Sequence, residues 1–379
     1  MKLGILGTRG IPANYGGFET FAEELAVRLV ERGHEVTVFC RSHYVSQEMK
    51  EYRGVRLKIF PTIRHKYFDT LVHSLICSGW ALFQSFDAML VCNAANGFCC
   101  AILSAGKIPS ILNVDGIERR RRKWGVVGKS WYRLSEFVSV RLAGCLISDA
   151  KVIQEYYRKE HGQDTACIPY GFTYQQTEGS KILASLGLAP RRFYLYVSRL
   201  EPENNAHVVI RAHRQAGCHL PLLIVGDAPY ARKYIDGLKR LAGNNVHFTG
   251  AVYGLEYHAM QARAWSYIQA TEVGGTHPAL VEGMGYGNMV LANDTPENRE
   301  VLGDAGLYYR KNDPEDLAMI MKHTEGNDLL RAQKGLQARQ RVEQNYCWSE
   351  VTSQYEEIFK SLVQRKECGR RPISAKNGV

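Results

Sequence analysis

A glycine-bearing loop in the second half of the sequence has the residue types of a nucleotide site. Residues 273–284 read V-G-G-T-H-P-A-L-V-E-G-M, a glycine loop followed by a helical pattern with Glu282 on its second turn. Amides at a helix start bind phosphate oxygens, and a carboxylate can accept both ribose hydroxyls. Glu282 could instead be an ordinary solvent-facing residue, but its apolar neighbours indicate a half-buried face, where a carboxylate needs a partner.

Two other loops carry residues suited to phosphate. Arg199 stands between a predicted strand and a predicted helix, where it could pair bidentately with a phosphate or make only a surface ion pair. Gly16 and Gly17 open a predicted helix, and their bare backbone could approach a diphosphate, although a plain turn is an equally good interpretation. The glycines after the first strand lack the G-x-G-x-x-G spacing, which disfavours NAD binding.

A third group follows a predicted strand that ends at Val114. Asp115 could orient or deprotonate a hydroxyl, and a turn aspartate before Gly116 is an almost equal alternative. The run R-R-R-R-K at 119–123 could bind a diphosphate or anionic lipid headgroups, or it could be a solvated basic face. Aromatic and apolar residues from Trp124 onward favour a peripheral membrane edge.

The elements that must position these residues alternate between short apolar runs and helix-period segments, as in parallel α/β sheets. A helix is expected over 19–32, where apolar residues recur at helical spacing before Gly33. Strands are predicted at 3–6, 35–40, 55–60, 88–92, 110–114 and 145–148, and again at 193–197, 222–225, 246–248, 266–269, 289–292 and 307–309. Each half is therefore expected to be a doubly wound sheet, which binds ligands beyond the carboxyl ends of its strands.

The chain of 379 residues is long enough for two domains of ordinary size. We expect a first Rossmann-like domain in 1–170, a linker in 171–192, a second domain in 193–345, a C-terminal helix in 346–364 and a disordered tail in 365–379. The most apolar stretch, 71–83, is too short to span a membrane.

Composition narrows the class of partner. The net charge of +10 suits nucleic acid, anionic lipid or phosphorylated small molecules, but no nucleic-acid recognition motif is evident. The ten cysteines form no C-x-x-C pair, and several lie in apolar runs, which indicates core thiols in a reducing cytoplasm. No carboxylate cluster is spaced for a metal ion, and no cofactor is expected.

In this order, and over nearly the whole chain, these elements resemble retaining glycosyltransferase family 4, whose members have the GT-B fold. The family start G-G-x-E is matched by 16–19, and its G-R-L-x-x-E-K-N motif is matched in part by 198–200 and 203–205. A strand-ending Gly-Asp is matched at Gly226, and the second acid of E-x7-E is matched by Glu282. The resemblance implies two Rossmann-like domains facing across a cleft, with 346–364 as a crossover helix that packs back on the first domain.

The resemblance also implies roles for particular residues. It implies that a nucleotide-diphosphate sugar is bound by Gly16, Gly17, Arg199, Asn204, Asn205, Gly226, Gly274, Gly275, Thr276, His277 and Glu282. It implies that a lipid-linked or saccharide acceptor is bound by Glu19, Glu118, Arg121, Lys123 and Trp124, with Asp115 as the catalytic residue. The leaving phosphate could itself be the base, which would make Asp115 a positioner. The reaction would be independent of metal.

The chain departs from the family pattern at positions that concern the donor. Asn204 replaces the usual lysine, Gly274 stands where the first acid of E-x7-E is expected, and Glu272 is out of register. Residues 7–12 and 114–124 resemble a bacterial subgroup that includes rhamnosyltransferases of polysaccharide assembly, which implies a dTDP-rhamnose donor and a lipid-diphosphate-linked acceptor at the inner face of the membrane. A sugar-nucleotide epimerase or phosphorylase of the same architecture and a basic nucleic-acid-binding protein are the alternatives.

Overall fold

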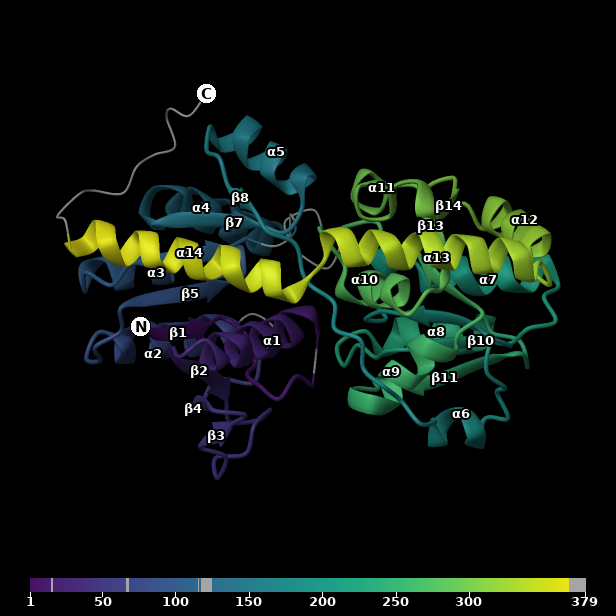
Figure 1. Cartoon of the computed structure of the whole chain (residues 1–379), viewed down its shortest axis with the longest axis horizontal. Coiled ribbons are helices and arrows are strands. Elements are labelled where there is room, and N and C mark those ends of the chain that lie inside the picture. Colours follow the sequence, from purple (N-terminus) through teal and green to yellow (C-terminus); the bar gives the residue numbers. More distant parts are fainter. Residues whose placement is uncertain (15, 66–67, 115, 117–124, 368–379) are drawn as a thin grey trace. The chain divides into compact units, whose positions relative to one another are not determined.

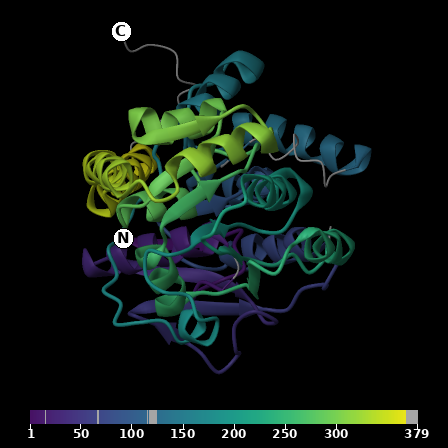
Figure 2. The same cartoon turned by 90° about the vertical axis from the view of Figure 1, so that its right-hand side faces the viewer.

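The chain folds into two compact units. The computed structural model describes residues 1–14, 16–65, 68–114, 116 and 125–367. The first unit comprises residues 1–170 and the C-terminal segment from Trp348, and the second comprises residues 171–347. Helices lie on both faces of the strands in each unit (Figure 1, Figure 2). Both units are therefore α/β layers of the kind that the alternating pattern predicts.

The first unit contains a largely parallel sheet in the order β3-β4-β2-β1-β5-β6-β7-β8. Only the β3–β4 pair is antiparallel. The strands are β1 (Lys2–Leu6), β2 (Glu35–Arg41), β3 (Glu51–Tyr52), β4 (Val55–Phe60), β5 (Ala88–Cys92), β6 (Ser110–Asn113), β7 (Cys145–Ser148) and β8 (Ala166–Cys167). All six strands predicted for this half are present. The sequence missed β3 and β8, because a strand of two residues has no periodicity to detect.

Helices of the first unit include one from the far end of the chain. They are α1 (Gly17–Glu31), α2 (Phe68–Ala81), the short η1 (Ala94–Asn96), α3 (Gly97–Ala105), α4 (Val126–Leu142), α5 (Lys151–His161) and α14 (Trp348–Glu367). The apolar stripe of α14 is buried in the same core as α1. Phe21 of α1 lies between two α14 rings, 6.2 Å from Trp348 and 5.4 Å from Tyr355 between centroids. This aromatic packing fixes α14 to the first unit.

The second unit contains six parallel strands in the order β11-β10-β9-β12-β13-β14. They are β9 (Tyr194–Val197), β10 (Leu222–Val225), β11 (Val246–Gly250), β12 (Ser266–Gln269), β13 (Met289–Asn293) and β14 (Gly306–Tyr309). In chain order this is the arrangement 3-2-1-4-5-6 of a doubly wound nucleotide-binding sheet, with its reversal between β9 and β12. The six strands predicted for this half are all present.

The segment 171–192, predicted as a linker, folds as part of the second unit. It contains α6 (Lys181–Ser185), whose first turn is capped by Ser180 and whose Leu183 is buried. Glu256 of α9 accepts a hydrogen bond from the Ser180 hydroxyl at 2.6 Å. The remaining helices are η3 (Pro202–Asn204), α7 (Ala206–Ala216), α8 (Arg232–Leu241), α9 (Gly254–Arg263), α10 (Pro278–Gly285), α11 (Pro296–Leu302), η4 (Gly303–Ala305), α12 (Pro314–Thr324) and α13 (Asp328–Asn345).

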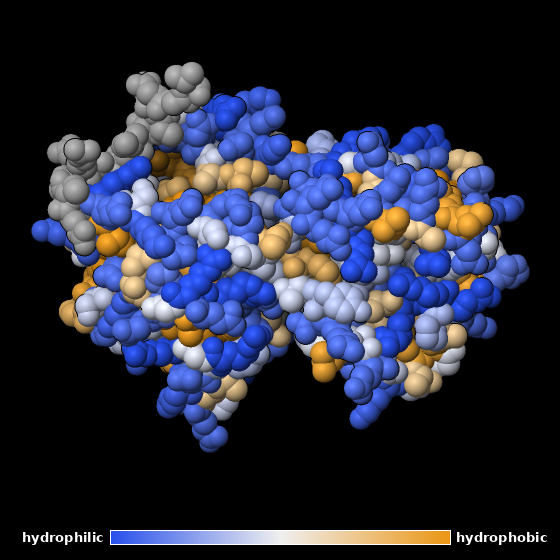
Figure 3. All heavy atoms as spheres, in the orientation of Figure 1, coloured by the Kyte–Doolittle hydropathy of each residue, from blue (hydrophilic) through white to orange (hydrophobic). Residues whose placement is uncertain are grey.

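On most of the chain, polar residues lie at the surface and apolar residues are buried. The face drawn in Figure 3 is mainly hydrophilic, with hydrophobic residues in small groups. Within the described residues, none of the helices is long and apolar enough to cross a membrane. Several cysteines are buried core thiols, and burial raises the pKa of Cys40 to about 12.

Candidate functional site

The carboxyl ends of β9 and β12 lie side by side at the centre of the second sheet. The two strands pair in parallel, with Tyr194 opposite Ser266. The sheet order reverses between them, so their following loops, 198–205 and 270–277, leave the same edge toward opposite sides. Doubly wound sheets bind their ligands at this position. Two of the phosphate-binding segments expected from the sequence stand on these two loops.

Arg199 lies directly after β9 and presents a partly exposed guanidinium. Its side chain is 32% exposed, and its Nη1 lies 3.9 Å from Glu201 Oε2. The backbone behind it is anchored because Leu200 N donates to Asp227 O at 3.4 Å. The loop thus holds a partly exposed cation at the ligand edge of the sheet.

Gly226 is required by the packing of two loops. Its φ is +142°, and a Cβ there would lie 1.8 Å from Ser198 O. Its amide donates to Gly250 O at 2.8 Å. The glycine therefore lets the β10 loop touch the backbone just before Arg199. Its amide is thus used within the fold, and its expected contact with the donor stays a prediction.

Asn204 and Asn205, expected from the sequence to contact the donor, are buried and bonded within the fold. Asn204 Nδ2 donates to Arg199 O at 2.7 Å. Asn205 has a φ of +61°, and its Nδ2 donates to Ala270 O at 3.0 Å and to Asn312 Oδ1 at 2.8 Å. Their side-chain amides therefore hold the loops after β9 and β12 in place.

A network of asparagines that the sequence did not indicate fixes the end of β12. Asn293 Nδ2 donates to Ala270 O at 3.1 Å and to Asn312 Oδ1 at 2.8 Å. The Asn312 amide group in turn donates to the Glu272 carboxylate. Asn298 Nδ2 donates to Asn293 O at 2.9 Å. The only sequence signal was an asparagine at the ends of two predicted elements, and asparagines are common there for turn formation alone.

The His277 ring lies against the backbone of Gly274, where the side chain of a larger residue would be. A Cβ at Gly274 would lie 2.3 Å from Cε1 of the His277 ring. Gly274, Gly275 and Thr276 are buried, and His277 is half-buried just before Pro278 begins α10. The imidazole thus fills the space that a side chain at position 274 would need.

Glu282 lies half-buried on the second turn of α10. Its carboxylate accepts a hydrogen bond from the Tyr257 hydroxyl, which also accepts from Gln261 Nε2 at 3.0 Å. Burial, and secondarily the Glu282 charge, raise the pKa of Tyr257, so the phenol remains a hydrogen-bond donor at neutral pH. One side of the carboxylate is thereby held by Tyr257 on α9.

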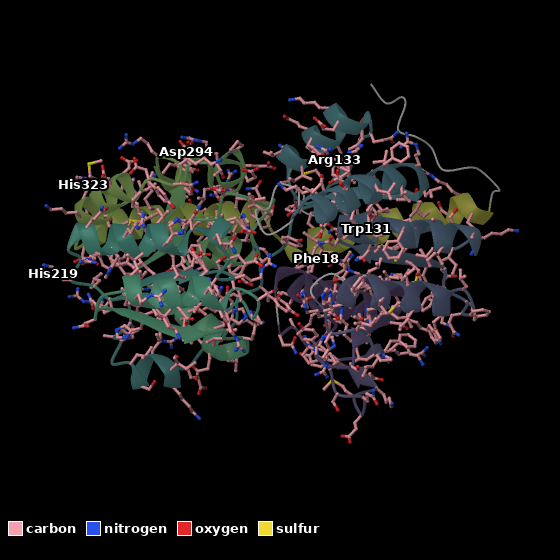
Figure 4. The ribbon with its side chains drawn as sticks, turned by 180° about the vertical axis from the view of Figure 1, so that it is seen from behind. Phe18, Trp131, Arg133, His219, Asp294 and His323 are labelled. Atoms are coloured by element: carbon pink, nitrogen blue, oxygen red, sulfur yellow. The ribbon has the colours of Figure 1, made fainter. Side chains whose placement is uncertain are left out.

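In the first unit, Gly16 caps α1 through its carbonyl, which accepts from Glu19 N at 3.1 Å. Gly17 is the first residue of that helix. Glu19, expected at the acceptor, is buried and accepts a hydrogen bond from Arg9 N at 2.9 Å. It therefore closes the loop after β1. Phe18, which stands between Gly17 and Glu19 in the sequence, is labelled in Figure 4.

The remaining expected acceptor-side residues lie outside the described residues. These are Asp115, Glu118, Arg121, Lys123 and Trp124. Among the residues that the structure does describe, no three His, Cys, Asp or Glu side chains gather as a metal-binding group.

The fold and the loops at the β9–β12 reversal define a nucleotide-binding α/β protein, and comparison with known families makes this specific. Residues 15–174 match the model of Glycosyltransferase Family 4, and residues 181–341 match the model of glycosyl transferases group 1. An uncharacterized glycosyltransferase of Methanocaldococcus jannaschii is 30% identical over 137 residues, and this match covers 34% of the chain and about a third (35%) of the relative. The chain belongs to glycosyltransferase family 4.

Solved structures support the same fold over the whole chain. Sucrose-phosphate synthase of Thermosynechococcus elongatus aligns with a TM-score of 0.81 at 18% identity, covering 96% of this chain and 99% of its own. HepE of Anabaena, in complex with UDP and glucose, aligns with a TM-score of 0.80 at 18% identity, covering 95% and 100%. The fold is GT-B, as predicted.

Proposed function

We propose that this glycosyltransferase moves a sugar from a nucleoside-diphosphate donor to a lipid-diphosphate-linked saccharide, with retention at the anomeric carbon. The observation that carries the donor side is the placement of Arg199 and the 274–277 loop at the β9–β12 reversal, followed by Glu282 on α10. HepE, which has the same fold, was solved with UDP-glucose. That structure supports a nucleotide sugar as the class of donor.

In the proposed reaction the bond between the anomeric carbon and the leaving phosphate oxygen breaks, and a bond from that carbon to the acceptor oxygen forms. The acceptor proton passes to the leaving phosphate or to Asp115. Arg199 and the amides of Gly275 and Thr276 stabilise the charge that develops on the nucleoside diphosphate. Glu282 accepts hydrogen bonds from the ribose hydroxyls. Gly16 and Gly17 remain proposed phosphate contacts from the first unit.

As the sugar we propose L-rhamnose, supplied as dTDP-rhamnose. The support is the resemblance of residues 7–12 and 114–124 to rhamnosyltransferases of polysaccharide assembly. UDP-glucose is the first competitor, because it is the donor bound in the HepE structure. The acceptor-side residues of this proposal are Asp115, Glu118, Arg121, Lys123 and Trp124. We place the reaction at the inner face of the cell membrane, without a metal requirement.

The experiment offers a panel of sugar nucleotides, including dTDP-rhamnose and UDP-glucose, with a lipid-diphosphate-linked acceptor, with and without EDTA. The measurement is acceptor-dependent nucleotide release. We expect release from one donor, unchanged by EDTA. Release from UDP-glucose alone would overturn the rhamnose assignment, and conversion of a sugar nucleotide without acceptor would replace transfer with epimerisation. No conversion of any donor would contradict the donor site.

A replacement of Asp115 by asparagine tests the catalytic side of the proposal. We expect turnover to fall strongly while donor binding, measured by calorimetry, stays the same. Unchanged turnover would remove Asp115 from the mechanism.

A further inference from the structure

Two helices of the first unit expose large apolar side chains to solvent. On α4 these are Val126, Trp131, Leu134, Phe137 and Leu142, and along α2 and the turn after it they are Phe68, Leu75, Ile76, Leu82 and Phe83. Phe83 is 85% exposed and Leu134 is 57% exposed. Single exposed apolar residues are normal on any protein, but five on or next to each of two helices in one unit are typical of an interaction surface.

The buried faces of the same two helices are unusually polar. On α4 the buried residues include Ser135, Glu136 and Ser139, and on α2 they include Ser74 and Ser78. A surface helix ordinarily buries its apolar stripe and exposes its polar side. Both helices depart from this rule in part, since Cys77 and Ala81 of α2 and Tyr132 of α4 are also buried.

Inside the fold several of these polar groups have partners, although Ser74 Oγ has none among the described residues. Ser135 Oγ donates to Ala94 O at 2.6 Å, and Tyr156 Oη donates to Glu136 Oε2 at 3.0 Å. On α2, Ser78 Oγ donates to Ser74 O at 2.8 Å. This arrangement is therefore built into the packing of the first unit, and rotating either helix to hide its apolar side would expose satisfied buried groups.

The two helices lie on one side of the sheet, with α3 between them. The connections β4→β5, β5→β6 and β6→β7 cross the sheet in the same direction, so right-handed crossovers place α2, α3 and α4 on the same side of it. The Phe98 ring of α3 lies 5.9 Å from the Trp131 ring, and Leu82 packs against Gly106, where a Cβ would lie 2.4 Å from it. We call the surface of α2, α3 and α4 that carries these ten exposed apolar residues the α2–α4 face.

Every exposed charge on these three helices is positive. Lys129, Arg133 and Arg141 are exposed on α4, and Arg141 lies over the Phe137 ring at 3.4 Å. The two acids of α2, α3 and α4 are buried, Asp69 against Arg41 at 2.6 Å and Glu136 against Tyr156. Figure 4 labels Trp131 and Arg133 on this unit. Apolar and cationic side chains thus share the α2–α4 face, without an exposed acid on its helices.

We propose that the α2–α4 face binds the surface of an anionic phospholipid bilayer. Its apolar side chains enter the boundary between headgroups and acyl chains, and Lys129, Arg133 and Arg141 meet the lipid phosphates. A second copy of the chain is a poorer occupant, because a twofold contact through this face would bring the same cations together. The proposal uses none of residues 119–123 and does not depend on which donor the enzyme takes.

The test is flotation of the full chain with vesicles, in the absence of donor and acceptor. One set is phosphatidylcholine alone, and the other is equal parts phosphatidylcholine and phosphatidylglycerol. We expect the chain to float with the anionic vesicles. Leu134→Gln with Phe137→Gln should lower the partition coefficient by roughly tenfold or more. Lys129→Gln with Arg133→Gln should lower it by roughly twentyfold, on anionic vesicles only.

The matched control is Leu329→Gln with Leu336→Gln, which removes two exposed leucines from α13 in the second unit. The control should float as the unchanged chain does. Flotation of the Leu134/Phe137 variant at the unchanged level, or failure of the unchanged chain to bind anionic vesicles, would overturn the proposal. A dimer that this variant dissociates, seen by analytical ultracentrifugation, would assign the face to a second copy instead. Because these measurements need no turnover, they separate this proposal from the proposed reaction.

Discussion

At the scale of single residues, replacing Arg199 should separate an effect on donor binding from an effect on folding. Its guanidinium is partly exposed, with Nη1 3.9 Å from Glu201 Oε2, so replacing it removes a charge without emptying a core. We expect Arg199→Gln to lower kcat/KM for the donor by roughly 100-fold or more, as for the loss of a donor group that stabilises a developing oxyanion. The melting temperature should stay within a few degrees.

The control for Arg199→Gln is Arg240→Gln, which removes an exposed arginine from α8. Steady-state kinetics of both variants with the accepted donor make the comparison. Equal kcat/KM in the two variants would mean that Arg199 makes only a surface ion pair.

Gly274 and His277 form a pair whose coupling can be measured. A Cβ at 274 would lie 2.3 Å from the His277 ring, so Gly274→Ala must displace that ring. We expect a cost of about 1–3 kcal/mol in the free energy of unfolding, the usual range for overpacking. In a His277→Ala background the same change should cost less than about 0.5 kcal/mol. Denaturant unfolding of the four chains in the cycle provides the test, and equal costs in both backgrounds would contradict the contact.

The residue scale is also where sequence reasoning reached its limit. The loop 273–284 and Arg199 could be predicted as a donor site because glycine, arginine and a helix acid at those spacings suit a phosphate and a ribose, and this role stays a prediction. The roles of Asn204 and Asn205 could not, because the partners that use their amides are Arg199 O nearby and Ala270 and Asn312 far along the chain. A side-chain amide looks the same in sequence whether it faces a ligand or a distant loop.

At the scale of elements, α14 is joined to the turn that follows α1 by an ion-pair cluster around Glu356. Its carboxylate accepts from Arg32 Nη1 at 3.0 Å and lies 3.1 Å from His34 Nε2. Hydrogen bonds from Lys360, then Arg32 and His34, lower the pKa of Glu356 from 4.5 to about 2. A lowered pKa in the folded state means that the charged carboxylate stabilises the fold above pH 4.5 and loses this effect as the pH falls toward 2.

We therefore expect Glu356→Gln to melt at a lower temperature than the unchanged chain at neutral pH. The difference should narrow as the pH falls below 4.5, because the unchanged chain then loses the same charge. Glu350→Gln, an exposed change on the same helix, should show no such difference. Melting curves between neutral and acidic pH provide the measurement. A difference that stays constant with pH would mean that the carboxylate's charge contributes nothing.

Strands and helices with a strong hydrophobic period could be predicted, whereas the two-residue strands and the exposed apolar side of α2 could not. The twelve predicted strands are apolar runs between turn residues, and all are present within a residue or two of their expected ends. The strands β3 and β8 are too short to show alternation. The exposed apolar face of α2 was equally hidden, because a helical period shows that a helix has two faces without showing which one is buried. On α4, in contrast, the apolar and aromatic residues after Trp124 predicted a membrane edge.

At the scale of the whole molecule, the chain returns to its first unit only after completing its second. The loss of α14 would leave Phe21 without Trp348 and Tyr355 and would leave Arg32 without Glu356. The second unit, in contrast, consists of one continuous stretch, 171–347, with its own sheet and its own buried clusters. We therefore expect that one continuous fragment can fold as the second unit, whereas the first unit needs both of its separate segments.

We expect the fragment 171–347 to unfold cooperatively and to bind a nucleoside diphosphate, because Arg199, the 274–277 loop and Glu282 all belong to it. The fragment 1–170 should expose apolar surface and aggregate, whereas joining it to 348–367 through a flexible linker should restore a cooperative transition, since α14 then covers Phe21. Thermal melts of the three proteins, with and without UDP or dTDP for 171–347, provide the measurement. A melting temperature of 171–347 that no nucleotide raises would contradict a donor site held by the second unit, and a stable, monomeric 1–170 would show that α14 is dispensable to the first.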